Sequence, residues 1–258
     1  MTNSPSLAPA VYLIGAGPGD PELLTVKAHR LIQQADVILY ANSLVPVQIL
    51  EDTKPEAEFI ATGSQTLEQI VPTMIARVKA GLSVVRLHSG DLTLYSAIQE
   101  QIQLLKAAGI PFELVPGISA FQAAAADLAT ELTIPKLVQT IILTRIGGEA
   151  SPMPPTEELA ALAAHQSSLC LYLAARHVDR AQAELLVHYA PDTPVAICYR
   201  VGWPDQQYWL TTLNSMAEVS QEQKLIRTTL YLISPALGLE QTERSQLYHP
   251  NHRHLFRR

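Results

Sequence analysis

A glycine-rich stretch directly follows the apolar run at 11–14, near the start of the chain. Its glycines alternate along the sequence: Gly15, Gly17 and Gly19. The apolar run predicts a buried strand, and the glycines predict a loop that makes close contacts through its backbone. Asp20 is a favoured N-cap residue, and Pro21 suits the first helical position, whose N–H has no partner in a helix. The pattern therefore predicts a strand, a tight loop and a helix start.

One chemistry for such a loop is phosphate binding, because glycines after a first strand often hold a pyrophosphate at the next helix N-terminus. The alternating glycines do not match the G-x-G-x-x-G fingerprint, and Pro18 removes an N–H where a phosphate needs donors. The predicted strand at 36–41 also ends without the acidic residue that binds a ribose hydroxyl. A nicotinamide-dependent oxidoreductase of doubly wound fold remains the alternative from another enzyme class.

Length and composition limit the possible classes of protein. The 258 residues suit one large or two modest domains, and 48% are apolar, enough for a sizeable core. The net charge of −6 gives no overall basic footprint, so we expect no nucleic-acid partner. We find neither an export signal nor an apolar run of about 18 residues, and expect a cytoplasmic protein that does not bind membranes. Cys170 and Cys198 lie in apolar runs, which predicts small buried side chains.

The first half of the chain alternates strand-like and helical patterns. After the first strand they predict strands at 36–41, 83–87 and 112–115, and helices at 22–34, 66–79, 96–108 and 121–129. Pro72 should kink the second of these helices or mark a later start. In such an α/β array, ligands bind at the carboxyl ends of the strands, so we expect the loops at 15–21, 88–95 and 116–120 to share one cleft.

The second half begins with a break near 133–136 and mixes βα units with adjacent strands. Strands are predicted at 138–144, 168–173, 194–199, 207–213 and 228–233, and helices at 156–165 and 179–189. The strand at 207–213 is expected to form a hairpin with the strand before it. We therefore expect an α/β fold with a mostly parallel sheet in an N-terminal domain, 1–136, and a mixed α+β domain at 137–240. A polar tail, 241–258, carries His249, His252 and His254, whose spacing could bind a metal, although a tail that is solvated or docks at an interface is the favoured interpretation and we expect no metal site.

Five segments, in order along the chain, carry a resemblance to a known family: Gly15–Lys27, Arg86–Asp91, Pro116–Ala124, Gln139–Arg145 and Tyr199–Pro204. Together they resemble the tetrapyrrole methylases, the S-adenosylmethionine-dependent enzymes of corrin and sirohaem synthesis. The match runs through most of the chain, and the tail segments 245–248 and 254–257 add a weaker part.

The resemblance implies a two-domain fold and a homodimer, with the methyl donor in the cleft between domains and the macrocycle beside it. The implied activity is methylation of a ring carbon in cobalamin synthesis, and C11 of precorrin-4 or its cobalt form is the expected position. The alternatives are the same chemistry at another ring position, or a tetrapyrrole carrier without catalysis. The sequence does not indicate whether the ring already holds cobalt, because that metal would be part of the substrate and needs no ligand from the protein.

Positions that match the family's motifs imply the donor contacts: Pro18, Ser89, Gly90, Asp91, Leu94, Ser119, Ala120, Leu173, Tyr199, Arg200, Val201, Thr228 and Thr229. Two positions depart from the family. Leu92 stands where relatives usually carry proline, and Leu173 stands where they often carry methionine, a change that keeps the apolar character.

The chemistry of the donor agrees with this assignment. S-adenosylmethionine is a sulfonium cation without phosphates, so a loop poor in free N–H groups suits it better than it suits a dinucleotide. Its methyl group leaves by in-line displacement, for which alignment of donor and acceptor can lower the barrier by roughly 7 to 11 kcal/mol. The ring carbon is itself the nucleophile, so we expect no catalytic triad.

The implied macrocycle carries acetate and propionate groups, which call for cations at the site. The candidates lie at or near predicted strand ends: Arg86, Arg145, Arg176 and Arg200. Each could equally serve in an ordinary surface contact or ion pair. His88 could contact substrate or move a proton, although a hydrogen-bonded structural histidine is the favoured interpretation. Asp91 could orient the donor or hold its own loop by accepting backbone N–H groups.

Overall fold

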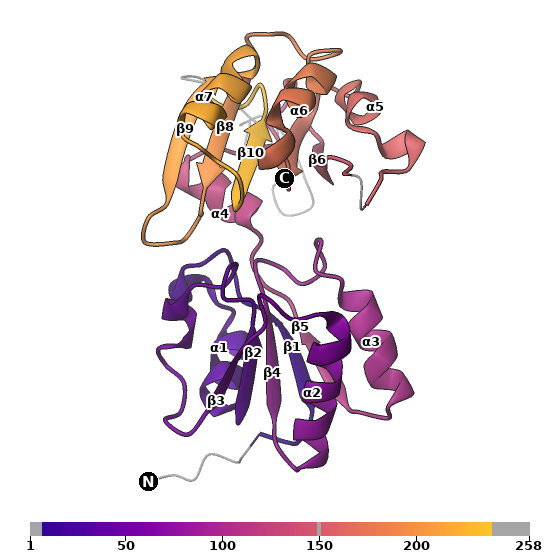
Figure 1. Cartoon of the computed structure of the whole chain (residues 1–258). Coiled ribbons are helices and arrows are strands. Elements are labelled where there is room, and N and C mark those ends of the chain that lie inside the picture. Colours follow the sequence, from indigo (N-terminus) through magenta and orange to yellow (C-terminus); the bar gives the residue numbers. More distant parts are fainter. Residues whose placement is uncertain (1–6, 149–150, 239–258) are drawn as a thin grey trace, which may run out of the picture. The chain divides into compact units, whose positions relative to one another are not determined.

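The computed structural model describes residues 7–148 and 151–238. Contacts divide the described chain into two compact units, residues 7–123 with 200–205 and residues 124–199 with 206–238 (Figure 1). The division falls earlier than the boundary expected at 136, because the segment after 123 packs with the second unit. The Ser168 hydroxyl donates to the Leu132 carbonyl (2.7 Å), and the Tyr208 hydroxyl donates to Asp127 (2.6 Å). The predicted tail, 241–258, lies outside the described residues.

The first unit is a five-stranded parallel sheet with helices on both faces. Its strands are β1 (Val11–Gly15), β2 (Val37–Tyr40), β3 (Glu58–Ala61), β4 (Val84–His88) and β5 (Phe112–Val115), in the order β3-β2-β4-β1-β5. Helix α1 (Val26–Gln34) packs on one face, while α2 (Leu67–Lys79) and α3 (Ile98–Ala107) pack on the other. The expected parallel N-terminal sheet is thus confirmed.

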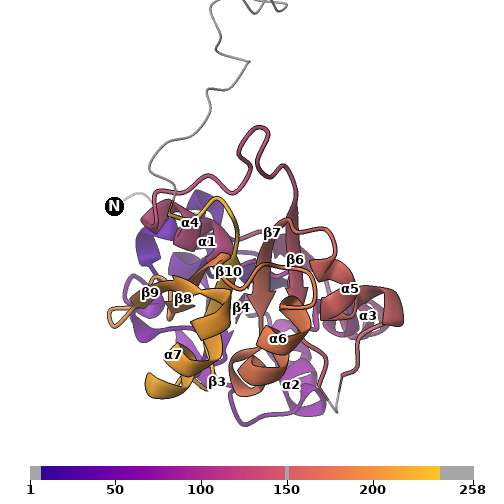
Figure 2. The same cartoon turned by 90° about the horizontal axis from the view of Figure 1, so that it is seen from above.

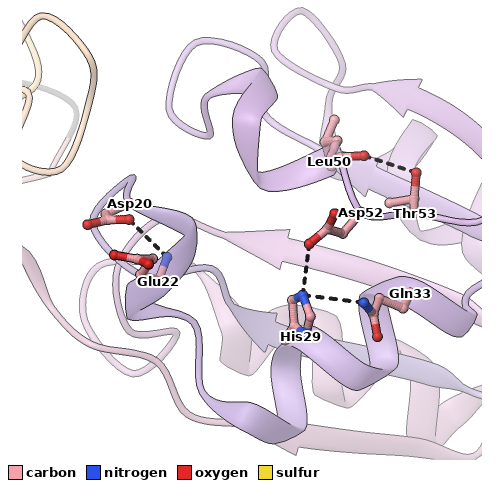
Figure 3. Close-up of polar contacts among 7 residues, drawn as sticks. All are labelled: Asp20, Glu22, His29, Gln33, Leu50, Asp52 and Thr53. Atoms are coloured by element: carbon pink, nitrogen blue, oxygen red, sulfur yellow. Dashed lines mark hydrogen bonds and ion pairs between the residues drawn. The ribbon is translucent and has the colours of Figure 1, made fainter.

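Three local details differ from the sequence expectations in this unit. The helix expected at 22–34 is split: Asp20 caps a 3₁₀ turn, Pro21–Leu23, by accepting from the Glu22 N–H (2.9 Å), and α1 begins only after Thr25 (Figure 3). A later start at Pro72 is wrong, since α2 begins at Leu67 behind a capping box of Thr66 and Gln69. Strand β3 was missed because its residues are mostly exposed at the sheet edge.

The second unit is a mixed sheet. Its strands are β6 (Ile141–Arg145), β7 (Ser168–Tyr172), β8 (Pro194–Tyr199), β9 (Gln207–Thr212) and β10 (Thr229–Ile233), in the order β6-β7-β10-β8-β9. Only β6 and β7 pair in parallel, and β8 and β9 form the expected antiparallel hairpin. Helices α5 (Leu159–Ala163), α6 (Val178–Leu185) and α7 (Met216–Glu222) cover one face, with α6 and α7 side by side in Figure 2.

The remaining helical elements are short. Helix α4 (Ala120–Asp127) connects the two units, and 3₁₀ turns lie at Val47–Leu50, Pro155–Glu157, Ala175–His177 and Leu213–Ser215. Helices α5 and α6 are shorter than the sequence predicted, α7 was missed, and β6 begins three residues later than expected. Within the described residues, no helix combines the length and hydropathy needed to cross a bilayer.

Both cysteines are buried, as expected. Cys170 and Cys198 point away from the helix-covered face of the second sheet, because they alternate with the residues that face those helices. Burial raises the pKa of the Cys170 thiol to about 12. The pKa of the Cys198 thiol is raised too, first by burial and then by the neighbouring Cys170 and Asp127. Both groups therefore stay protonated and unreactive at neutral pH.

Gly15 and Gly117 of the first unit are required by the close approach of the chain's own backbone. A Cβ atom on Gly15 would lie 2.6 Å from the Gly117 nitrogen and 2.8 Å from the Gly90 carbonyl oxygen. A Cβ atom on Gly117 would lie 2.3 Å from that same Gly90 oxygen. The loops that follow β1, β4 and β5 therefore meet backbone against backbone.

Replacing Gly117 with alanine tests this contact. The added methyl group has no space unless two loops separate, so we expect Gly117→Ala to lower the free energy of unfolding by about 1 to 3 kcal/mol. Urea denaturation followed by circular dichroism measures the change. Gly148→Ala is the matched control, because a Cβ atom at Gly148 meets nothing within 4 Å. Equal stability of the two variants would contradict the proposed close contact.

Candidate active site

Backbone hydrogen bonds join the glycine-rich loop to the loop after β4. The Ala16 N–H donates to the His88 carbonyl (2.7 Å), and Gly17 and Gly90 exchange two bonds (3.1 and 2.7 Å). Two successive N–H groups of the loop are thus used within the protein, and Pro18 has none to offer. A phosphate bound here would lack the donors that nucleotide sites provide.

Asp91 holds the loops after β4 and β5 together. One carboxylate oxygen accepts from the Gly117 N–H (2.8 Å), and the other accepts from the Thr93 N–H (2.9 Å) and the Thr93 hydroxyl. Burial raises the pKa of Asp91, but these hydrogen bonds from Thr93 and Gly117 outweigh it, so the pKa lies below its ordinary value. Asp91 is therefore an ionised structural clamp, the second of the two roles that the sequence allowed.

A segment from far along the sequence completes this side of the first unit. Gly202 lies so close to the glycine-rich loop that a Cβ atom on it would be 2.7 Å from the Asp20 nitrogen, and a Cβ atom on Gly19 would be 2.6 Å from the Trp203 ring. Gln48 links these two loop segments, since its side-chain amide donates to the carbonyls of Gly19 (2.8 Å) and Gly202 (3.2 Å). The segment 200–205 is thus fixed on the loop.

The structure brings the predicted donor contacts of the first unit together. Pro18, Ser89, Gly90, Asp91, Leu94, Ser119 and Ala120 all lie in or directly after the three joined loops. Ser89 is exposed, whereas Pro18 and Ser119 are buried. Ser119 precedes α4, and its N–H donates to the Gln122 side chain (2.9 Å), as in a helix cap. Leu92, the departure from the family, is buried.

In the second unit, the predicted contacts gather at one edge of the sheet. Thr229 opens β10 opposite Tyr199, the last residue of β8, and the β10–β7 register places Leu173 two residues beyond the last pair, next to Thr229. Thr228 precedes Thr229, whereas Arg200 and Val201 follow Tyr199 in sequence but are counted with the first unit. The antiparallel pairing therefore collects residues from three strands at this edge.

Leu173 combines two unfavourable features. It is 64% exposed although it is apolar, and its φ of 55° is left-handed although it has a side chain. Thr228 (φ 53°), directly before β10, and Arg200 (φ 50°), directly after β8 in sequence, share this conformation. Each such residue costs on the order of 1 to 3 kcal/mol, and strain of this kind concentrates at binding sites.

The candidate arginines differ in their burial and in the contacts that the protein makes with their side chains. Arg86 is 8% exposed inside β4 and donates to the Thr62 hydroxyl (2.7 Å), so it does not face solvent as expected. Arg145 donates to the backbone carbonyl (2.9 Å) and hydroxyl (2.8 Å) of Ser151. Arg200 pairs with Asp205 and stacks on Trp203, 4.1 Å from the ring centroid. Arg176 is exposed, and the described residues provide it with no hydrogen bond or ion pair.

His88 lies on the same face of β4 as Arg86, two residues further on. It is 7% exposed, and its Nε2 atom has no hydrogen-bond partner among the described residues, so the expected hydrogen-bonded histidine is not seen at this atom. Burial, and then the charge of Arg86, lowers the pKa of the imidazole to about 3. The ring is therefore neutral at physiological pH and is not a general acid there.

Several residues that shape the site were not found from the sequence. Thr62, Gln48 and Trp203 make contacts whose partners lie 24 to 184 positions away along the chain. No local pattern signals such contacts. Among the described residues, no group of three or more His, Cys, Asp or Glu side chains is arranged to hold a metal ion.

The pKa of His88 generates a pH-dependent prediction. The folded pKa of about 3 lies below that of a free imidazole, so the unfolded chain takes up this proton first as the pH falls. The stabilisation is complete above about pH 6.5 and decreases below it by about 1.4 kcal/mol per pH unit. Between pH 7 and pH 5, we expect the wild type to lose about 2 kcal/mol more stability than His88→Gln, measured by urea denaturation. Parallel losses in both proteins would contradict the buried neutral state.

Comparison with known proteins agrees with this geometry. The Tetrapyrrole (Corrin/Porphyrin) Methylases family matches residues 10–217. The precorrin-4 C(11)-methyltransferase of Pseudomonas aeruginosa is 46% identical over 247 residues, which cover 96% of this chain and 98% of the relative. The cobalt-precorrin-4 C(11)-methyltransferase of Methanocaldococcus jannaschii is 41% identical over 249 residues, 96% of each protein.

Solved structures show the same relationship. The X-ray structure of a cobalt precorrin-4 methyltransferase has 42% identity and a TM-score of 0.85, covering 89% of this chain and 96% of that one. The uroporphyrin-III C-methyltransferase of Thermus thermophilus, solved in complex with S-adenyl homocysteine, has 28% identity and a TM-score of 0.74, covering 88% of this chain and 98% of that one. The chain belongs to the tetrapyrrole (corrin/porphyrin) methylase family.

Proposed function

We propose that this protein is an S-adenosylmethionine-dependent methyltransferase that methylates C11 of precorrin-4 or cobalt-precorrin-4 in cobalamin synthesis. The observation that carries the proposal is the near-full-length similarity, at 46% and 41% identity, to relatives named for this reaction. The second candidate is the same chemistry at another ring position, which the likeness to a uroporphyrin-III C-methyltransferase favours. The cytoplasmic location and the homodimer implied by the family remain predictions.

The residues of the first unit fit a donor without phosphates. The N–H groups of Ala16 and Gly17 are bonded within the protein, and Pro18 has no N–H. A nicotinamide dinucleotide would place its pyrophosphate against this surface without donors, at a high desolvation cost. The same observation counts against the oxidoreductase alternative.

The residues at the edge of the second sheet fit the apolar parts of such a donor. Leu173 presents an exposed side chain in a strained backbone conformation next to Thr229, which pairs with Tyr199 on its other side. Burial of that side chain against a ligand would be favourable at about 25 cal/mol per Å² of apolar area. We infer that Leu173 binds the donor, together with Tyr199, Val201 and Thr229.

Catalysis by this chain would then rest on positioning. Bound S-adenosylmethionine supplies an electrophilic methyl group on a cationic sulfur. The loops after β1, β4 and β5, fixed to one another by Asp91 and by their glycine backbones, provide a rigid surface for orientation. Rigid alignment of this kind is the source of rate enhancement in a displacement that needs neither acid nor base at the sulfur. The neutral imidazole of His88 adds no positive charge near the loop.

Methyl transfer with a labelled donor tests the proposed reaction. The protein is incubated with isotopically labelled S-adenosylmethionine and precorrin-4 or cobalt-precorrin-4, and the product is analysed by mass spectrometry and carbon NMR. We expect one added methyl group, located at C11. A methyl group at another carbon would support the second candidate, and a product without label, next to an active control enzyme, would refute both.

The variant Leu173→Gly tests whether Leu173 contributes to donor binding without contributing to the stability of the fold. Glycine adopts a positive φ without strain and the side chain is mostly exposed, so the free energy of unfolding should change by less than about 1 kcal/mol. The affinity for S-adenosylhomocysteine, measured by calorimetric titration, should fall about threefold to tenfold because an apolar contact is lost. Leu210→Gly is the control, since Leu210 is equally exposed at 64% but lies on β9, away from the β7–β10 edge. Unchanged affinity in Leu173→Gly would contradict its role in donor binding.

A further inference from the structure

The second unit contains a pocket of about 510 Å³ beside the edge that carries Leu173 and Thr229. The pocket is lined by the 3₁₀ turn that follows β7, by the start of α6, and by the end of α7 with the chain that leads into β10. Its lining begins two residues after Leu173, at Ala175, and ends two residues before Thr228, at Ile226. The lining residues therefore lie close along the chain to Leu173 and Thr228, two residues with a left-handed φ.

The charged groups of the pocket are mainly cationic. Arg176 and Lys224 both line it, both are exposed, and the side chain of neither makes a hydrogen bond or ion pair within the described residues. Its one carboxylate, Asp179, already accepts a hydrogen bond from the Gln221 side chain (2.7 Å). The local surplus of positive charge contrasts with the chain as a whole, whose formal net charge is −6.

The pocket joins these cations to apolar surface. Leu225 and Val178 form a buried part of the lining, and Ile226 stands 57% exposed at its rim. Lys224 also has a left-handed φ of 54°, which fixes its backbone at a cost. A ligand that matches this surface is apolar in its body and carries carboxylates on flexible arms.

We propose that this pocket binds carboxylate arms at the rim of the tetrapyrrole substrate, with Arg176 and Lys224 as the cationic contacts. The inference rests on the proposed function, which supplies a flat apolar ring with acetate and propionate groups. Arg176 offers two parallel donors to a carboxylate, while Lys224 offers a point charge. Because other candidate arginines are bonded within the chain, these two cations determine how the ring is held at this edge.

Charge-neutral variants test the proposal. Arg176→Gln, Lys224→Gln and the double variant are titrated with uroporphyrin, a stable polycarboxylate tetrapyrrole, and with S-adenosylhomocysteine. We expect each single variant to raise the uroporphyrin Kd, and the KM for the substrate, by about threefold to tenfold. The double variant should weaken binding further, with kcat and the S-adenosylhomocysteine Kd near wild-type values. Arg30→Gln, an exposed arginine on α1, is the control and should behave as wild type.

The outcomes of these experiments distinguish a failure of the pocket proposal from a failure of the proposed function. Wild-type affinity for uroporphyrin in the double variant would overturn the pocket proposal, even if methyl transfer is observed. A parallel loss of S-adenosylhomocysteine affinity would also overturn it, because the carboxylate recognised would then be the donor's. If the wild type transfers no methyl group, the proposed function fails, while weaker uroporphyrin binding by the variants would still support the pocket.

Discussion

The loops after β1, β4 and β5 meet where no side chain fits, and the site of the first unit depends on this contact. Gly15, Gly90 and Gly117 approach one another through backbone atoms alone. Glycine loses more conformational freedom on folding than any other residue, so such a contact is kept only where its geometry is needed. In return, the loops hold their shape through short backbone hydrogen bonds and the Asp91 carboxylate. A ligand therefore meets a glycine-rich loop in which the N–H groups of Ala16 and Gly17 are already bonded and Pro18 has none, which favours a donor without phosphates.

The second unit reaches a defined binding edge by a different physical route. Its sheet is mixed, so the ends of β7 and β8 and the start of β10 fall on the same edge. Non-glycine residues in left-handed conformations mark all three positions. Such strain persists only where surrounding structure enforces it, here the strand pairing on either side. In the first unit, close contacts between glycines make the loops rigid. In the second unit, strand pairing holds the residues with a left-handed φ in place.

Local patterns predicted the parallel sheet, the hairpin and most helices, since each has a periodicity visible within ten residues. They failed for β3, whose residues are mostly exposed and which is ordered by pairing with β2. They also failed after Asp20, where the predicted helix start is a 3₁₀ turn. Arg86 shows the same limit within the site. Its position near a strand end suggested exposure, but its side chain is buried and donates to Thr62, a residue on another strand's loop. Sequence patterns identify elements better than they identify side-chain environments.

Electrostatics shows why the positions of the unpaired cations matter. A chain of formal net charge −6 attracts no polyanion at long range. At physiological ionic strength, salt also screens the interactions of each exposed charge beyond a Debye length of about 8 Å. The proposed recognition of an acidic ring would therefore require cations that lie near one another and are not paired with a carboxylate of the protein. Arg200 is paired with Asp205, and Arg145 is bonded to Ser151, whereas Arg176 and Lys224 share one pocket with a single, already bonded Asp179. The proposed recognition of carboxylates by the second unit thus depends on where the fold leaves cations unpaired, more than on how many it contains.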